Sequence, residues 1–295
     1  MDKIQRNATI RELAFRAGFD LAAFTGPSVG ERESKALSEW IDKGRAGTMD
    51  YMKRSPERRS DARLSLASCR SVIVLAVNYY HPEDPKPSSD TPLGKVSKYA
   101  YGRDYHAIIE KMLKRLSAMI REEVDAAAEL KAYVDTGPIL ERAFARQAGL
   151  GFIGKNTNLI TREYGSWVFL SCLLTDLELE PDKPHEGACG TCRICIDACP
   201  TGALDGAHGL DATRCISYWS IEAKEPPPAD LRARFGEWIF GCDICQDVCP
   251  YNFRAKTTRQ VQLYPEKRAG TWIDPAALPS GAFPGPLKRA KLIPK

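Results

Sequence analysis

"CGTCRICIDACP", residues 189–200, carries four cysteines, Cys189, Cys192, Cys195 and Cys199, with a proline directly after the last. The spacing C-x2-C-x2-C-x3-C-P is typical of bacterial ferredoxins that bind iron–sulfur clusters, in which the fourth cysteine serves the other cluster. A shorter version, "CDICQDVCP", returns at residues 242–250 and lacks one cysteine. The two runs predict a ferredoxin-like unit with two four-iron clusters.

Two such clusters need eight thiolates, and the two runs supply seven. Among the remaining cysteines, Cys215 lies between the runs, whereas Cys69 and Cys172 lie far upstream in predicted strands and are expected to be buried packing residues. We therefore predict two ligand sets: Cys189, Cys192, Cys195 and Cys249 for one cluster, and Cys199, Cys215, Cys242 and Cys245 for the other. Zinc is the alternative, and this spacing is unusual for it.

The composition is that of an ordinary globular protein. The chain has 295 residues, of which 43% are hydrophobic and 27% charged, and its net charge of +4 neither demands nor opposes a nucleic-acid partner. The start has no apolar signal segment, and the longest apolar run, residues 71–80, is too short to span a membrane. We expect a cytoplasmic protein with no membrane partner, in which ten cysteines favour metal binding or catalysis over disulfides.

Strand and helix patterns alternate up to about residue 150, which predicts an α+β fold with an α/β-like layered first domain. The expected helices are 9–18, 34–44, 104–124 and 138–149, and the expected strands are 20–26, 71–80 and 130–137. A hairpin is expected over 158–179, turning at Tyr164-Gly165. We predict domains at 1–180 and 181–255 and a basic, proline-rich tail at 256–295.

"GLGFIGKN" (149–156) matches a dinucleotide-binding fingerprint and most of a phosphate-binding P-loop. The glycines follow a predicted helix and lead into strands, which is the reverse of the required order. The P-loop also needs Ser or Thr after the lysine, where this chain has Asn156. We interpret the segment as a loop that displays four polar residues, Lys155, Asn156, Thr157 and Asn158.

Beyond the cysteines, the chain resembles the epoxyqueuosine reductase family over about residues 8–270. The resemblance is carried by "KAYVDTGPILERAFARQAGLGFIGKN" (131–156), "YAYGRDYH" (99–106), "RCISYWSIE" (214–222) and "GCDICQDVCP" (241–250). It implies reduction of epoxyqueuosine to queuosine at the wobble base of tRNA, with residues 1–180 binding cobalamin and an external donor supplying electrons to two [4Fe–4S] clusters.

The resemblance also implies roles for single residues. Asp135 matches the family's proton donor, which predicts a pKa raised by burial; capping of the following helix is the alternative. Cobalamin contacts are implied for Arg58, Tyr99, Asp135, Asn158, Ser217 and Asp243, and a tRNA contact for Lys224. The nearest match to the D-x-H-x-x-G motif that supplies a histidine ligand, "DYHAII" (104–109), has Ile109 in place of glycine, so we expect base-off cobalamin.

For the tRNA, basic clusters at 53–63, 253–260 and 286–295 are candidate phosphate contacts. Tyr218 and Trp219 are candidate stacking platforms, with a core role as the equal alternative. Many family members continue into a helical-repeat domain, which we expect to be absent here, and we expect a monomer. Two other functions remain open: a reductive dehalogenase-like enzyme that acts on a small molecule, and an electron carrier without cobalamin.

Overall fold

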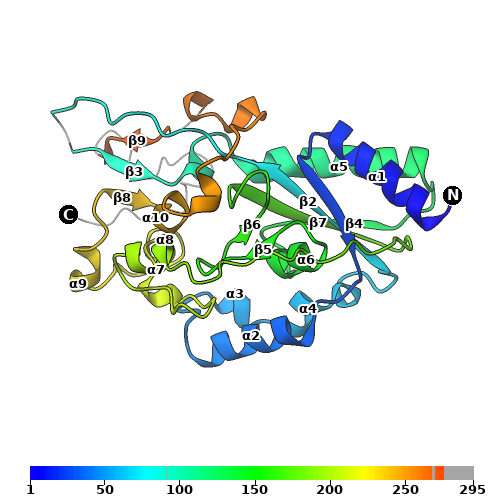
Figure 1. Ribbon diagram of the computed structural model, residues 1–295, viewed down its shortest axis with the longest axis horizontal. Coiled ribbons are helices and arrows are strands. Elements are labelled where there is room, and N and C mark those ends of the chain that lie inside the picture. The colour runs from blue at the N-terminus through cyan, green and yellow to red at the C-terminus, as the bar shows by residue number, and fades with distance from the viewer. Residues whose placement is uncertain (91, 268–269, 276–295) are drawn as a thin grey trace.

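A four-stranded antiparallel sheet organises the first part of the chain (Figure 1). The computed structural model describes residues 1–90, 92–267 and 270–275. The sheet has the order β1 (Leu21–Thr25), β2 (Ser71–Asn78), β7 (Val168–Thr175) and β4 (Leu130–Val134), and every neighbouring pair is antiparallel.

Every residue of β2 is buried, as the continuous apolar run predicts for a strand covered on both faces. Ile73, Leu75 and Val77 face one core, against α1 (Lys3–Ala17) and α5 (Tyr105–Glu123). The alternate residues Val72 and Val74 face a second core, which includes Phe144 of α6 (Glu141–Gln147). The sheet therefore lies between two helical layers.

Short helices dominate the remainder. They are α2 (Glu31–Asp42), α3 (Asp50–Lys53), α4 (Pro56–Ser60), α7 (Ile194–Ala198), α8 (Ile216–Ile221), α9 (Ala229–Arg232) and α10 (Ile244–Asp247). In Figure 1, α7 to α10 lie together at the end of the molecule away from α1. No helix of the described residues is both long and apolar enough to cross a membrane.

Several elements differ from the sequence-based expectation. The helix expected at 9–18 begins at Lys3, and the strand expected at 130–137 ends at Val134. The helix expected at 138–149 begins only at Glu141, because the turn after β4 continues through Pro138. The hairpin over 158–179 is wrong: β6 (Leu159–Ile160) pairs with β5 (Phe152–Ile153), whereas β7 pairs with β2 and β4. The buried side chains of β7 favour a central place in the sheet over a two-stranded hairpin.

A small mixed sheet joins distant parts of the chain. β3 (Gly94–Val96) pairs parallel with β8 (Trp238–Phe240) and antiparallel with β9 (Trp272–Ile273). Residues 256–264 of the predicted tail also return to the first sheet, where Thr258 N donates to Tyr80 O at 2.7 Å. The α+β fold class is confirmed, and the division at residues 180 and 255 stays a prediction.

Candidate active site and cysteine groups

Four thiols form the first cysteine group (Cys189, Cys192, Cys195 and Cys249). Burial raises the pKa of Cys195, and the other three thiols raise it further, so all four lie within electrostatic reach of one another. The backbone N–H of Lys155 donates to Cys189 Sγ at 3.3 Å. Such N–H donors fit a thiolate that ligates a cluster, because they stabilise negative charge on sulfur.

The second cysteine group holds the remaining predicted ligands (Cys199, Cys215, Cys242 and Cys245). Burial raises the pKa of Cys245, and the other three thiols add to this effect. Ala203 N donates to Cys199 Sγ at 3.4 Å. No three His, Cys, Asp or Glu side chains that could hold a single metal ion occur among the described residues. In each group, the four predicted cysteines thus lie within electrostatic reach of one another. That they ligate a cluster stays a prediction.

The turn between β5 and β6 connects the two cysteine groups. Lys155 Nζ donates to Gly190 O at 2.8 Å and to Cys192 O at 2.9 Å, in the loop of the first group. Asn156 Nδ2 donates to Cys245 O at 3.2 Å, in the second group. The polar residues that the sequence placed on a loop therefore hold both cysteine loops in position.

Asp135 follows the last residue of β4 and has a positive φ of 54°. Its Oδ2 accepts a hydrogen bond from Tyr105 Oη at 2.8 Å and lies 3.2 Å from His106 Nε2. His106 Nδ1 lies 2.8 Å from Asp104 Oδ1. One imidazole thus bridges two carboxylates at the start of α5.

The charges of this arrangement reverse one prediction. The hydrogen bond from His106 lowers the pKa of Asp135, with burial opposing it and Tyr105 and Arg142 assisting. The hydrogen bond to Asp135 in turn raises the pKa of His106, and Asp104 adds to that. Burial by itself raises the pKa of Asp135, but the expected net rise is wrong, because the hydrogen bonds and positive charges of the neighbours outweigh desolvation.

The predicted cobalamin contacts lie on several elements. Tyr99 lies within electrostatic reach of Asp135: burial raises its pKa, and the charges of Asp135 and Asp243 raise it further. Ser217, in α8, lies beside the second cysteine group, where it hydrogen-bonds to Cys215. Arg58 lies in α4 and Asn158 directly before β6. Their roles as cobalamin contacts stay predictions.

Asp243 is buried and lies in the sequence between two cysteines of the second cysteine group, Cys242 and Cys245. Ser97 Oγ donates to its Oδ1 at 2.6 Å, and Lys98 N donates to its Oδ2 at 2.7 Å. Burial raises the pKa of Asp243 to about 6, with the Lys98 ammonium opposing this. Its carboxylate therefore ties the β3 region to the second cysteine group.

Arg58 Nε and Glu141 Oε1 are among the buried side-chain atoms of the described residues that have no hydrogen-bond partner. Burial raises the pKa of Glu141 to about 8, so its carboxyl is largely neutral at pH 7 and can donate a hydrogen bond. An unpartnered guanidinium N–H and an unpartnered oxygen of a neutral carboxyl fit a bound group that presents amide and phosphate oxygens, as cobalamin does.

The residues predicted to contact tRNA are divided. Lys224 is exposed and acts electrostatically on Asp50, whereas Tyr218 is buried and its Oη bonds to Thr48, which favours the core role for this ring. In the cluster at 53–63, Lys53, Arg59 and Arg63 bond within the protein. The basic cluster at 286–295 lies outside the described residues.

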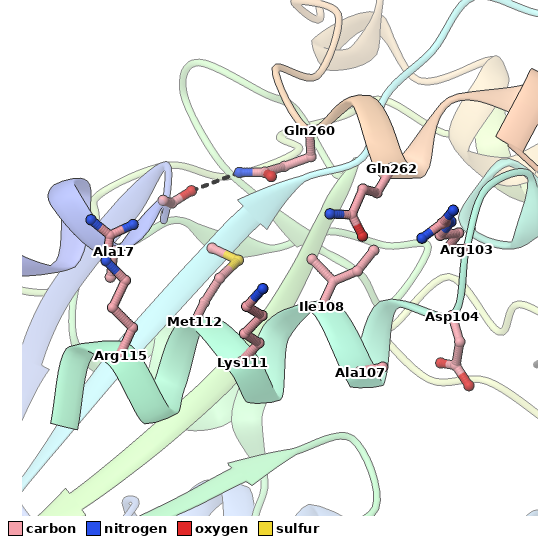
Figure 2. A pocket seen from close by; sticks show the side chains of 11 residues that line it. Ala17, Arg103, Asp104, Ala107, Ile108, Lys111, Met112, Arg115, Gln260 and Gln262 are labelled. Carbon is pink, nitrogen blue, oxygen red and sulfur yellow. Dashed lines mark hydrogen bonds between the residues drawn. The ribbon is translucent and has the colours of Figure 1, made fainter. Parts of the chain in front are cut away.

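A pocket of about 760 Å³ lies between α5, the end of α1 and residues 260–262. Figure 2 shows the side chains that line it. Arg103, Lys111 and Arg115 line it, and Lys111 points into the space between α5 and the two glutamines, Gln260 and Gln262. Asp104 lies at the same end of α5 as Arg103 and also lines the pocket. This cationic surface therefore adjoins the Asp104–His106–Asp135 contacts.

Comparison with known proteins identifies the family. The family described as "Epoxyqueuosine reductase QueG, DUF1730" matches residues 59–136. An epoxyqueuosine reductase from Leadbetterella byssophila is 39% identical over 281 residues, which cover 95% of this chain and 91% of that protein. This chain belongs to the epoxyqueuosine reductase family. The one from Synechocystis is 44% identical over 225 residues, covering 76% of each chain.

Solved structures of this family have the same fold. Epoxyqueuosine reductase from Streptococcus thermophilus has a TM-score of 0.79 and 34% identity, over 88% of this chain and 69% of that one. A crystal structure of an epoxyqueuosine reductase with an epoxyqueuosine-modified tRNA stem loop has a TM-score of 0.81 and 31% identity, over 99% of this chain and 72% of that one. A "4Fe-4S double cluster binding domain" matches residues 188–252, which confirms the iron–sulfur unit.

Sequence reasoning found Asp135 through the family and the cysteines through their spacing, but it missed His106. "DYHAII" was interpreted only as an incomplete cobalamin motif. The usable signal was the D-x-H spacing at the start of a predicted helix, since Asp104 caps α5 and holds one ring nitrogen of His106.

Proposed function

We propose that this protein reduces epoxyqueuosine in tRNA to queuosine. The observation that carries the proposal is the carboxylate of Asp135, held by Tyr105 and His106 at the end of β4, in a member of the epoxyqueuosine reductase family. Loss of an epoxide oxygen as water requires a positioned proton donor, and this pair supplies one. The binding of a tRNA stem loop by a relative of the same fold supports tRNA as the partner.

Cobalamin is the proposed second cofactor, because unpartnered Arg58 Nε and Glu141 Oε1 fit its oxygens. When bound, it would supply the redox-active cobalt for the two-electron reduction of the epoxide. Arg58, Tyr99, Asn158 and Ser217 would hold the corrin, and Asp243 would fix the adjoining cysteine loop. Both ring nitrogens of His106 face carboxylates, so neither is free to ligate cobalt. This supports a base-off form of cobalamin without a histidine ligand.

We further propose that the two cysteine groups hold two [4Fe–4S] clusters that relay electrons from an external donor. The second group is the proposed neighbour of the active site, because Asp243 lies between two of its cysteines and acts on Tyr99 together with Asp135. Cys215→Ala should remove about four of about eight irons per chain. Cys172→Ala is the matched control, since Cys172 is fully buried in β7. An unchanged iron count in Cys215→Ala would reject this ligand set.

The deciding experiment incubates the reduced holoenzyme with tRNA that carries epoxyqueuosine and follows queuosine by nucleoside mass spectrometry. Asp135→Asn should retain both clusters, cobalamin and tRNA binding and lose turnover by at least about 100-fold. Asp125→Asn is a suitable control, because Asp125 is an exposed loop residue whose bond to Ala127 N an asparagine can keep. A wild-type protein that binds cobalamin but forms no queuosine would exclude the proposed function.

A further inference from the structure

We propose that His106 is the proton source that recharges Asp135 during turnover, and that Asp104 fixes the tautomer and charge of His106. The proposal rests on the proposed function and deepens it. It starts from the contacts that join three side chains in a row, Asp104 Oδ1 to His106 Nδ1 at 2.8 Å and His106 Nε2 to Asp135 Oδ2 at 3.2 Å.

The stoichiometry of the reaction requires more than one proton. Removing an epoxide oxygen as water breaks both carbon–oxygen bonds, forms a carbon–carbon double bond, and consumes two electrons and two protons. The clusters and cobalamin of the proposed function supply the electrons. A single carboxyl group carries one proton, so Asp135 must be protonated again within each turnover or be assisted by a second donor.

The geometry points to His106 as the group that holds the proton for Asp135. Both ring nitrogens of His106 face carboxylate oxygens, and a carboxylate only accepts hydrogen bonds, so the arrangement favours the imidazolium with two N–H donors. Asp135 is already engaged by Tyr105 Oη, which also donates to Oδ2. The resting pair is therefore an Asp135 carboxylate beside a protonated His106.

The proposed step is a proton transfer within this pair. His106 gives its Nε2 proton to Asp135 Oδ2 and becomes neutral, with the remaining proton on Nδ1 facing Asp104. Asp135 passes the proton to the departing oxygen and becomes a carboxylate again. His106 Nε2 then takes a proton from water, which reaches the ring because 27% of the side chain is exposed. A second passage through the same atoms completes the water molecule.

Neighbouring groups determine how strongly His106 keeps its charge. Asp104 and Asp135 face the ring nitrogens, and Tyr105 stacks on the ring with centroids 4.1 Å apart. Arg142 from α6 acts on Asp135, whose pKa its positive charge lowers. The other titratable groups that interact electrostatically with Asp135 are Tyr51, Tyr99 and Glu141.

Asp104 offers a substitution that changes charge and keeps the fold. Its Oδ1 caps α5 by accepting from His106 N at 3.0 Å, and asparagine caps helices as well as aspartate does. Asp104→Asn should therefore leave α5 intact and remove the negative charge that lies beside His106 Nδ1. Asp2→Asn is the matched control, since Asp2 caps α1 in the same way, accepting from Gln5 N at 2.8 Å.

The first test measures the His106 pKa by NMR in protein labelled with ¹³C-histidine. The chain has four histidines, so His106→Gln assigns the signal by its loss. We expect Asp104→Asn and Asp135→Asn each to lower the pKa of His106, and Asp2→Asn to leave it unchanged. A pKa that moves in neither active-site variant would overturn the proposal without any activity measurement.

The second test is the pH dependence of single-turnover queuosine formation by the loaded enzyme. The wild-type rate should fall as pH rises through the pKa of His106, and Asp104→Asn should shift that fall to lower pH. His106→Gln should lower the rate about 100-fold or more, remove this dependence on pH and leave tRNA affinity unchanged. An active wild type with an unaltered His106→Gln variant rejects this inference alone, whereas an inactive wild type rejects the proposed function and the inference with it.

Discussion

Asp135 combines an unusual backbone conformation with a carboxylate that is held by two side chains, Tyr105 and His106. A positive φ costs a non-glycine residue about 1 kcal/mol, and aspartate tolerates it better than most. The cost is offset by the contacts of Asp135 Oδ2 with Tyr105 and His106. If residue 135 continued β4 in an extended conformation, its side chain would point in another direction. Strain at this position is therefore coupled to the geometry of the proposed proton donor.

Glu141 gives a prediction about stability and pH. Burial raises its pKa from 4.5 to about 8 in the folded protein, so the folded state holds this proton more tightly than the unfolded state. The free energy of unfolding should not depend on Glu141 below about pH 4.5, and should fall as pH rises from there towards about 8. The side chain of Glu141→Gln is neutral at every pH. Between about pH 4.5 and 8, the free energy of unfolding of this variant should therefore fall by ~1–3 kcal/mol less than that of the wild type, measured by urea unfolding of the cobalamin-free protein.

Glu110→Gln controls for the loss of an acidic side chain, since Glu110 is exposed on α5. Its pH dependence should follow the wild type. Parallel stability curves for Glu141→Gln and wild type between those pH values would show that Glu141 ionises normally.

At the residue scale, sequence reasoning succeeded where chemistry depends on spacing along the chain. The cysteine groups were predictable because cluster ligands recur at fixed intervals. The pair of His106 and Asp135 was not, because the two residues are 29 positions apart and meet only when α5 packs beside the end of β4. The sign of the Asp135 pKa shift depends on that same contact.

At the scale of elements, the turn between β5 and β6 gives a prediction in which two neighbouring residues have separate effects. Lys155→Ala removes both bonds from Nζ to the first cysteine loop, and Asn156→Ala removes the bond to Cys245 O. We expect Lys155→Ala to speed loss of the first cluster to an iron chelator, and Asn156→Ala to speed loss of the second. Each lost hydrogen bond is worth about 1 kcal/mol, which predicts roughly five-fold to thirty-fold faster loss.

Electron paramagnetic resonance during chelation distinguishes the two reduced clusters. Lys183→Ala serves as a control, being an exposed lysine outside this turn. Equal loss of both clusters in both variants would show that the turn acts only as a general spacer.

The basic face of α5 gives a prediction about tRNA. Lys111 and Arg115 line the pocket in Figure 2 with Arg103 and are exposed. If they contact phosphates, Lys111→Gln with Arg115→Gln should weaken tRNA binding and reduce the slope of log Kd against log salt by about 2. Fluorescence anisotropy with a labelled anticodon stem loop at several salt concentrations measures both quantities.

Lys114→Gln with Arg121→Gln is the matched control, because these residues lie on α5 but line a different pocket. If both pairs of substitutions reduced the slope of log Kd against log salt equally, tRNA binding would depend on the total positive charge of α5 and not on a contact surface in this pocket. Element patterns identified α5 correctly but could not show which of its cations share a concavity, since residues 260–262 complete the pocket from far along the chain.

At the scale of the whole molecule, the chain leaves the first sheet, builds the cysteine groups and then returns. Gln260 Nε2 donates to Gly18 O at 2.9 Å, and Arg259 pairs with the buried Asp20 at 2.8 Å. β3 meanwhile pairs with β8, which precedes the second cysteine run. The composition of residues 256–264 predicted a tail because partners such as Asn78 and Gly18 lie over 170 residues away, where local periodicity gives no sign of them.

Gly102 tests this return of the chain. A Cβ at this position would overlap the backbone of Gln262 and Leu263, and Arg103 N donates to Gln262 O at 2.8 Å directly beside it. Gly102→Ala should therefore push residues 260–264 from α5 and lower the free energy of unfolding by about 1–3 kcal/mol, measured by urea denaturation followed through the clusters and through circular dichroism. Gly26→Ala, whose Cβ would meet no atom within 4 Å, should change stability by less than about 1 kcal/mol.

The returning segment joins both parts of the molecule. In Gly102→Ala, loss of the clusters and unfolding of the sheet should therefore shift together to a lower urea concentration. If the sheet stayed stable while the clusters became labile, the two parts would unfold independently.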